Sequence, residues 1–142
     1  MICRELTDAC REGDRVCARI LVERGADVNF ADPERDDWYS WTPLMHASAR
    51  GHEDLIALLL AGGADVHFRD RDANTALTLA CREGHWSIAA LLLDRGADPS
   101  ERDHCDESAI DYALRDGQQD LVDRMRLLCR KMPPVVDAGV AA

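Results

Sequence analysis

Thiols and imidazoles are the side chains of this sequence with the greatest intrinsic reactivity. Six cysteines stand at positions 3, 10, 17, 81, 105 and 129, together with five histidines. Such groups can form a nucleophile–base pair or bind zinc, but no CxxC motif occurs and no Cys/His pair has the spacing of a local catalytic or zinc motif. Cys10 and Cys81 occupy equivalent positions in two similar segments. We therefore predict that both are buried, reduced thiols.

A second group combines aromatic rings with carboxylates. Trp38, Tyr39 and Trp41 are three of the seven aromatic residues, and Asp36 and Asp37 directly precede them. Aromatic side chains in a partly solvated loop are typical anchors of an interface, and neighbouring acids favour a basic partner. The alternative is that Trp41 packs on a neighbouring loop and Trp38 folds back onto its own. Catalysis is not expected, because no GxSxG, GxxxxGK[ST] or HExxH motif is present.

The segments that would position these residues are copies of one unit. A glycine recurs every 33 residues, as Gly51, Gly84 and Gly117. A six-residue motif recurs with it, as TPLMHA, TALTLA and SAIDYA. In the first copy, Thr42 supplies a helix cap, Pro43 takes the first helical position, and Gly51 ends the helix after two turns. A leucine-rich second helix follows, and its broad apolar surface needs packed neighbours on several sides.

A helix pair with TPL, a glycine–histidine turn, a leucine run and the triplet GAD, repeated with a period of 33, resembles the ankyrin repeat. The triplet occurs at 25–27, 63–65 and 96–98. The resemblance covers roughly residues 4–130 and implies an all-α solenoid of helix-turn-helix units with short β-hairpin fingers. We predict one domain over residues 1–132 and a flexible tail over 133–142. The predicted repeats span about 4–36, 37–73, 74–106 and 107–131.

The two end units depart from the inner ones as caps of a repeat stack should. Arg4 and Asp8 replace a threonine and an apolar residue of the inner units, and Arg124 and Arg126 replace leucines. Polar side chains keep an end face soluble, because no neighbouring unit covers it. The second helix of the first unit, about residues 15–24, is expected to direct three apolar side chains inward: Val16, Ile20 and Leu21.

Three of the five histidines lie in or next to the repeat helices, and we predict structural roles for them. The resemblance implies that His52 and His85 cap the loop between the two helices of a unit. Met45 stands where ankyrin repeats commonly place a histidine, and His46 takes the apolar position beside it. No second histidine or carboxylate has the helical spacing to build a catalytic site around His46, so we expect it to be semi-buried.

The formal net charge of −10 is concentrated in the predicted fingers. Residues 27–41 carry five acids and one arginine, residues 65–75 three acids and two arginines, and residues 98–108 five acids and one arginine. A surface of one sign attracts partners of the opposite charge and repels nucleic acid, which requires clustered Lys and Arg. No apolar run approaches the about 20 residues of a membrane span. We therefore expect a cytoplasmic or nuclear protein that binds neither nucleic acid nor membrane.

These observations predict a non-catalytic interaction module or adaptor. It would bind a protein or peptide of basic composition in a concave groove lined by the fingers and the ends of the first helices. We expect a monomer without a cofactor or metal ion. The residues expected to contact the partner are Asp36, Asp37, Trp38, Tyr39, Trp41, Arg50, Asp72, Arg82, Glu83, Asp103, Asp106 and Glu107.

Three other functions are compatible with the same sequence. The domain could be a structural spacer or could self-associate through its fingers. It could also read a basic tail, as ankyrin domains that bind histone tails do through aromatic and acidic finger residues, which Trp41 and the acidic fingers resemble. Finally, Asn29 resembles the position that an asparaginyl hydroxylase modifies in ankyrin repeats, although an asparagine there also suits a hydrogen-bonded turn.

Overall fold

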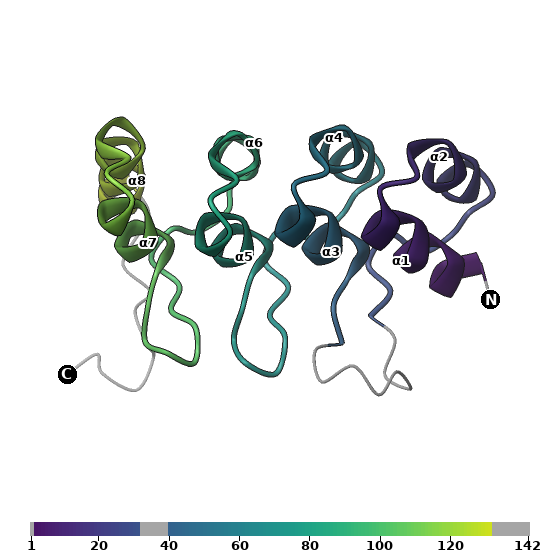
Figure 1. Cartoon of the computed structure of the whole chain (residues 1–142), viewed down its shortest axis with the longest axis horizontal. Helices are drawn as coiled ribbons and strands as arrows, with labels where there is room; N and C mark the ends of the chain where they lie inside the picture. Colours follow the sequence, from purple (N-terminus) through teal and green to yellow (C-terminus); the bar gives the residue numbers. More distant parts are fainter. Residues whose placement is uncertain (1, 32–39, 132–142) are drawn as a thin grey trace.

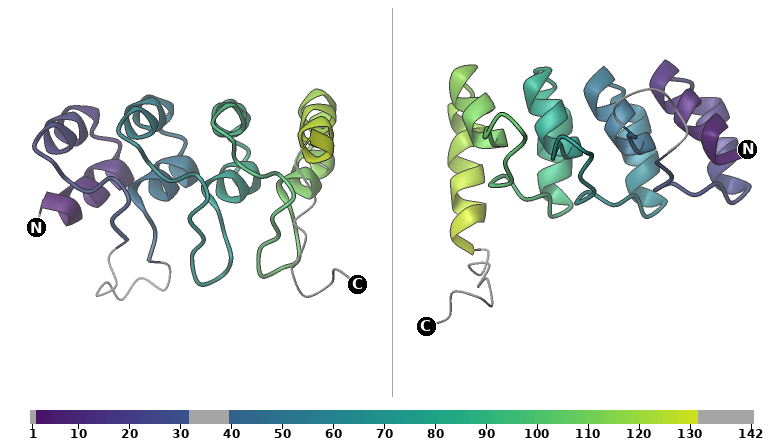
Figure 2. Two further views of the ribbon diagram at one scale, coloured as in Figure 1. Left: turned by 180° about the vertical axis from the view of Figure 1, so that it is seen from behind. Right: turned by 90° about the horizontal axis from the view of Figure 1, so that it is seen from below.

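The computed structural model describes residues 2–31 and 40–131, which form eight α-helices in four consecutive pairs (Figure 1). The pairs are α1 (Ile2–Glu12) with α2 (Arg15–Glu23), α3 (Pro43–Arg50) with α4 (Glu53–Ala61), α5 (Ala76–Arg82) with α6 (Trp86–Asp94), and α7 (Ala109–Arg115) with α8 (Gln119–Lys131). They stand side by side in one row, with the odd-numbered helices in one layer and the even-numbered helices in another (Figures 1 and 2). No helix within the described residues is long and apolar enough to cross a membrane.

The predicted helix signals act as expected. The Thr42 side chain accepts a hydrogen bond from the backbone N–H of Met45 at 3.3 Å, and Pro43 begins α3. Gly51 ends α3 with φ = 79°, a left-handed conformation that costs a glycine little. Thr75 and Ser108 begin α5 and α7 with reciprocal capping boxes, which satisfy backbone donors at each helix start.

The core is continuous from one end of the row to the other. Leu59, Leu92 and Met125 occupy the same position in successive pairs, and each is fully buried. Leu44 and Ser48, one turn apart on α3, are buried as well. A single pair of helices cannot enclose its own apolar side, so burial depends on the neighbouring pair.

Histidines tie neighbouring pairs together. The Nε2 atom of His85 lies 3.2 Å from the backbone oxygen of Ala49, and its ring covers Gly51 of the preceding pair. His52 covers Gly13 of the first pair in the same way. Neither side chain caps the helix that it precedes, so the expectation that they cap their own loops is wrong. Their partner is the previous unit, which a local pattern does not reveal.

The first pair is less enclosed than the sequence indicated. Leu21 is buried, as predicted, but Val16 is 60% exposed and Ile20 39% exposed. Both were expected to point inward. Val16 takes the position that Asp54 holds in α4, where the side chain also faces solvent. Ile20 faces the end of the row, where no pair within the described residues covers it.

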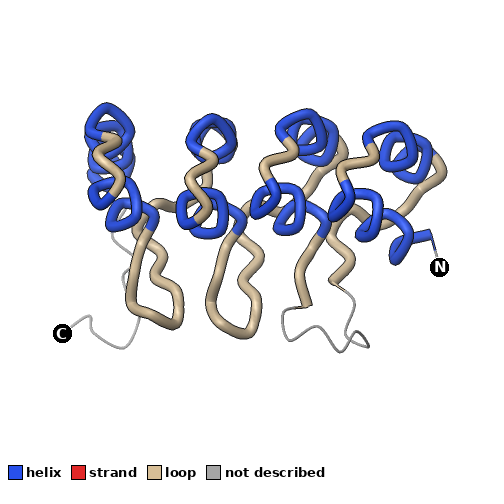
Figure 3. The backbone as a smooth tube through the Cα atoms, viewed as in Figure 1, coloured by secondary structure: helices blue, strands red, loops and turns tan. Residues whose placement is uncertain are grey.

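The middle finger (residues 65–75) and the last finger (residues 98–108) project from the same edge of the row (Figures 2 and 3). They are hairpin-shaped, but the described residues contain no β-strand and only one antiparallel bridge, between Arg102 and Ser108. The predicted β-hairpins are therefore not observed. Each loop is closed by a backbone hydrogen bond between residues four apart. Aspartate carboxylates accept further backbone N–H groups within the loops.

Candidate protein-interaction surface

Each described finger is organised around one aspartate five residues before a helix cap. Asp70 Oδ1 accepts backbone N–H groups from Asp72 at 2.9 Å and Asn74 at 2.8 Å. Asp103, 33 residues later, does the same for residues 105 and 107, at 2.9 and 3.1 Å. The carboxylate therefore sets the shape of the finger tip, and the repeat period reproduces that shape in the next unit.

The second oxygen of each aspartate fixes the finger to an aromatic side chain. Asp70 Oδ2 accepts the indole N–H of Trp41 at 2.7 Å, and Asp103 Oδ2 accepts the hydroxyl of Tyr112 at 2.5 Å. Trp41 directly precedes the cap of α3, so its bond joins the middle finger to the start of α3. Its ring also meets His46 edge-on, with 5.3 Å between ring centroids. Both fingers are thus held rigidly on the helices.

Burial and hydrogen bonding shift the pKa of Asp103 in opposite directions. Its side chain is nearly buried, and burial alone raises the pKa of the carboxyl group. Hydrogen bonds from Tyr112 and from the amides of Glu107 and Cys105 outweigh burial and hold that pKa below its ordinary value. Burial, with the bond to Asp103, raises the pKa of Tyr112, so its hydroxyl stays protonated and donates.

Replacing Tyr112 by phenylalanine should lower the free energy of unfolding by about 1–2 kcal/mol at neutral pH, because Asp103 loses a buried donor. A carboxyl whose pKa is lower in the folded state stabilises the fold above its unfolded pKa and loses that contribution as pH falls through the folded value. The difference between wild type and Tyr112→Phe should therefore shrink below about pH 4. Urea titrations at several pH values measure it, and a difference that stays constant with pH would contradict the charged bond.

The structure distributes the sequence-predicted contact residues unevenly. Asp106 is exposed and Asp72 half-buried, both in the described fingers. Glu107 pairs with Arg115. Asp103 is only 6% exposed, and its carboxylate accepts hydrogen bonds within the finger. Four of the predicted residues, Asp36, Asp37, Trp38 and Tyr39, lie outside the described residues.

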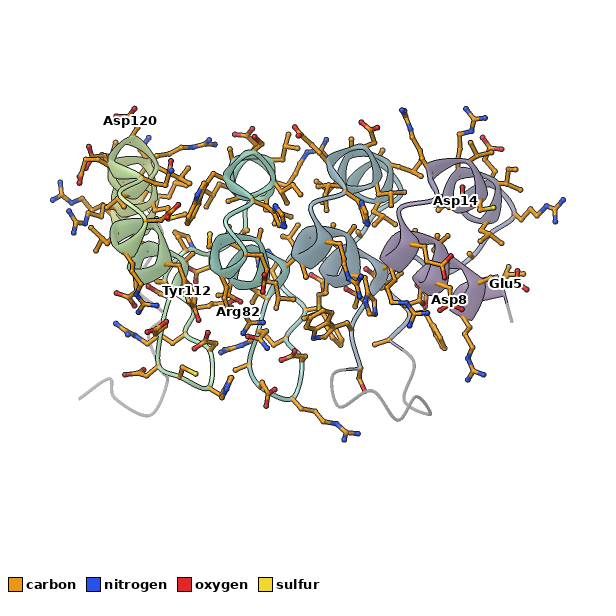
Figure 4. All side chains as sticks on the ribbon, in the orientation of Figure 1. Glu5, Asp8, Asp14, Arg82, Tyr112 and Asp120 are labelled. Carbon is orange, nitrogen blue, oxygen red and sulfur yellow. The ribbon has the colours of Figure 1, made fainter. Side chains whose placement is uncertain are left out.

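Three more of the predicted residues lie at the ends of the first helices, and Trp41 precedes the cap of α3. Arg50 and Arg82 are exposed at the last residues of α3 and α5, and Glu83 follows α5. Arg82 and Tyr112 lie between the third and fourth helix pairs (Figure 4). There a hollow of about 350 Å³ opens, lined by Cys81, Arg82, Glu83, Gly84, Trp86, Tyr112, Arg115 and Asp116.

Trp86 and Asp116 were absent from the predicted contact set, yet they form a wall of this hollow. The indole N–H of Trp86 donates to Asp116 at 2.7 Å, which links α6 to the end of α7. Trp86 stands in a slot that is polar in the other units, a signal visible in the sequence. Asp116 follows α7 as Glu83 follows α5, so the 33-residue period could have identified it as well.

Several finger acids are used in their own turns. Asp27, Asp65 and Asp98 each accept the backbone N–H of the residue two positions later, at 2.9, 2.8 and 2.9 Å. These carboxylates replace missing backbone partners in the link from the second helix of one unit to its finger. Their charge still contributes to the field around the fingers, although their positions are dictated by the fold.

Cysteine thiols can act as metal ligands or redox groups when they are accessible and readily ionised. Cys10 and Cys81 are buried, and burial raises the pKa of each thiol to about 12. Their burial is as the sequence predicted, and a thiol with so high a pKa is rarely ionised and therefore a poor nucleophile. Among the described residues, Asp103, His104 and Cys105 bring three ligand atoms within 4.8 Å of one another. Because Asp103 already accepts three hydrogen bonds there, we assign this group to the finger turn.

A row of stacked helix pairs, each burying its apolar side against the next and projecting a loop from one edge, defines a helical repeat protein of the solenoid class. The family model described as ankyrin repeats (3 copies) matches residues 6–103 and again residues 58–132. The chain therefore belongs to the ankyrin repeat family. Ankyrin repeats are generally non-catalytic modules that bind other proteins.

Individual relatives match about half of the chain. The 2-5A-dependent ribonuclease of Mus musculus is 39% identical over 75 residues, which are 53% of this chain and 10% of that protein. Ankyrin repeat and KH domain-containing protein 1 of Homo sapiens is 41% identical over 73 residues, 51% of this chain and 3% of that protein. Ankyrin repeat and SOCS box protein 16 of Homo sapiens is 44% identical over 65 residues, 46% of this chain and 14% of that protein. The chain thus corresponds to a small part of each relative.

Proposed function

We propose that this ankyrin domain is an adaptor whose finger edge binds a basic peptide or a basic segment of a partner protein. The single observation that carries the proposal is the location of the charge. The finger segments 27–41, 65–75 and 98–108 carry net charges of −4, −1 and −4, out of −10 for the whole chain. Such a one-signed edge raises the rate of encounter with a basic partner and disfavours acidic ones.

The described fingers supply two kinds of acid. Asp70 and Asp103 maintain finger shape, while Asp72 and Asp106 are available to a partner at the surface. Asp106 has a side chain 86% exposed and only a 3.8 Å contact with Arg102, which a basic peptide can replace at small cost. Surface charges of this kind determine encounter rate and specificity more than total affinity.

Rigidity supports the same function. The bonds from Trp41 to Asp70 and from Tyr112 to Asp103 hold the fingers before any partner arrives. Binding then loses less conformational entropy than it would with a mobile loop. In this proposal Trp38 and Tyr39 remain the apolar anchors that the sequence predicts. A single copy of the chain is sufficient to present the surface. The compartment is the reducing cytoplasm or nucleus.

The first-helix ends would extend the contact inward from the fingers. Arg82, Glu83 and Arg50 are exposed there, and the hollow beside Trp86 can accept one side chain of a bound peptide. Charges of both signs in this hollow would select a particular peptide register, because an unmatched charge is costly when desolvated. The concave groove of the proposal runs from this hollow to the finger tips.

An array of equal-length peptides that are basic, neutral or acidic tests the partner class, with titration calorimetry of the tightest basic peptide. Asp72→Asn combined with Asp106→Asn should weaken binding of that peptide about threefold to tenfold, since two charge pairs between the fingers and the peptide are lost. The loss should diminish as salt concentration rises.

The matched control is Asp54→Asn combined with Asp120→Asn, which removes the same charge from equivalent exposed positions of α4 and α8. Asp120 lies at the edge of the row opposite the fingers (Figure 4). The control should retain nearly wild-type affinity. Equal losses in both double variants would mean that only overall charge matters, and an array without preference for basic peptides would rule out the proposed partner class.

A further inference from the structure

The exposed large apolar side chains gather at the two ends of the row. Within the described residues they are Ile2, Val16, Ile20, Leu114 and Leu127. All five belong to the first or last helix pair, and the inner pairs have none of this kind. Exposed apolar side chains that gather on one face mark a place that another molecule can cover.

The end formed by α1 and α2 is a hollow of about 340 Å³ with an apolar floor and an acidic rim. Ile20, Leu21 and Ala9 line the floor. The rim carries four carboxylates, from Glu5, Asp8, Glu12 and Asp14, and Figure 4 shows three of them at this end. We call this the N-terminal hollow. In the inner units the equivalent face is covered by the preceding helix pair.

The opposite end is complementary in charge and in apolar character. Leu114 and Leu127 are 44% and 56% exposed on α7 and α8. Arg126, Arg130 and Lys131 are exposed on α8, close to its end. An apolar face with basic side chains at one end of the row can thus meet an apolar floor with an acidic rim at the other.

Known contacts between the third and fourth pairs show which residues would meet. Arg124 of α8 pairs with Asp94 of α6. Suppose that a second copy of the chain continued the row. Leu127 of the first copy would then stand in the position of Asp94, and Ile20 of the second copy in the position of Arg124. An ion pair at an inner junction thus becomes an apolar pair, and both of its members are exposed side chains of the ends.

A second junction contact transfers in the same way. Trp86 donates its indole N–H to Asp116 of the next pair at 2.7 Å. One unit further along, the corresponding residues are Gln119 and Glu12. The Gln119 amide can donate to the Glu12 carboxylate, so this contact also remains complementary.

From these matches we propose that the chain stacks end to end with a second copy, the α7–α8 face of one copy covering the N-terminal hollow of the next. The junction repeats the inner junctions, with Leu127 on Ile20 and Gln119 on Glu12. Because the two faces differ, the contact is heterologous and can extend to further copies. The fingers stay uncovered, so this association is independent of the proposed binding of a basic partner.

Sedimentation velocity of the full chain over a concentration series tests the proposal. The measurement should be made at about 0.15 M salt. At this concentration the Debye length is about 8 Å, which reduces the repulsion between two negatively charged copies. The wild-type weight-average mass should rise with concentration. Ile20→Glu and Leu127→Glu should each remain monomeric, because each places a charge in the apolar centre of the junction.

Mixing the two variants separates head-to-tail stacking from other associations. Ile20→Glu keeps an intact α7–α8 face, and Leu127→Glu keeps an intact N-terminal hollow. An equimolar mixture should therefore form a dimer and stop there, since the remaining faces oppose two glutamates. An isologous contact would instead stay disrupted in the mixture.

Val16→Glu is the matched control, because Val16 is an exposed apolar residue of the same helix outside the lining of the hollow. It should associate as wild type does, and thermal melts should show that all three variants are folded. The proposal is overturned if wild type stays monomeric throughout the series, if the mixture contains no dimer, or if Val16→Glu is as disruptive as Ile20→Glu.

Discussion

Alanine at Gly51 is expected to lower the free energy of unfolding by about 2–5 kcal/mol, whereas alanine at Gly84 should lower it by only about 1–2 kcal/mol. Both glycines have left-handed backbones, with φ of 79° and 78°, and a Cβ there costs about 1–2 kcal/mol. At Gly51 the new Cβ would also lie 2.7 Å from the His85 ring. Displacing that ring adds an overpacking cost of about 1–3 kcal/mol. At Gly84 no atom lies within 4 Å of the new Cβ.

Urea unfolding followed by circular dichroism measures both costs on the same scale. The comparison controls for backbone strain, because the two sites differ chiefly in the ring above them. Adding His85→Ala should recover part of the loss in Gly51→Ala and none of it in Gly84→Ala. Equal costs at the two glycines would show that the ring moves aside freely and that the histidine does not lock the junction.

The local parts of the fold were predictable because their signals lie within one unit. Thr42, Pro43 and Gly51 define the start and end of α3 through backbone donors and dihedral angles that neighbouring residues determine. The 33-residue spacing then carried the same helix to α5 and α7. The family and the helical stack followed from that repetition.

The contacts between units were harder to predict, since a repeat shows position within a unit but not which neighbour a side chain reaches. His85 was assigned to its own loop, although it binds the preceding pair. Ile20 was expected to point inward. Its equivalents in α4 and α6, Leu58 and Leu91, are indeed partly buried, but the first pair has no covering neighbour among the described residues, and Ile20 is 39% exposed. The presence of a covering neighbour, not the residue type, determines how exposed such a side chain is.

The sequence contains a pattern that predicts the finger turns, but a simple count of charges does not reveal it. Asp37, Asp70 and Asp103 all stand five residues before a helix cap. Counting them only as negative charge missed the structural task of Asp70 and Asp103, which bind backbone amides in their fingers. Acids at a fixed offset from a cap are better predicted as turn formers first and as partner contacts second.

Asp70→Ala is expected to lower the free energy of unfolding by about 2–4 kcal/mol, because it removes an acceptor of four hydrogen bonds. Two of the donors, the N–H and the side-chain amide of Asn74, belong to a residue that is 1% exposed. They cannot turn to water without opening the finger. The Trp41 indole N–H would also lose the Asp70 carboxylate as its acceptor, at 2.7 Å, and with it a bond that holds the finger to the start of α3.

Asp72→Ala is the matched control, since Asp72 lies two residues further along the same finger and contributes its backbone N–H to the network. Alanine keeps that N–H, so the stability should change by no more than about 0.5 kcal/mol. Urea unfolding measures stability, and the wavelength of tryptophan emission reports whether the indole environment has changed. A red shift is expected for Asp70→Ala and none for Asp72→Ala. Similar stabilities for the two variants would mean that the finger keeps its shape without the carboxylate, and the argument for a rigid, preformed finger edge would fail with it.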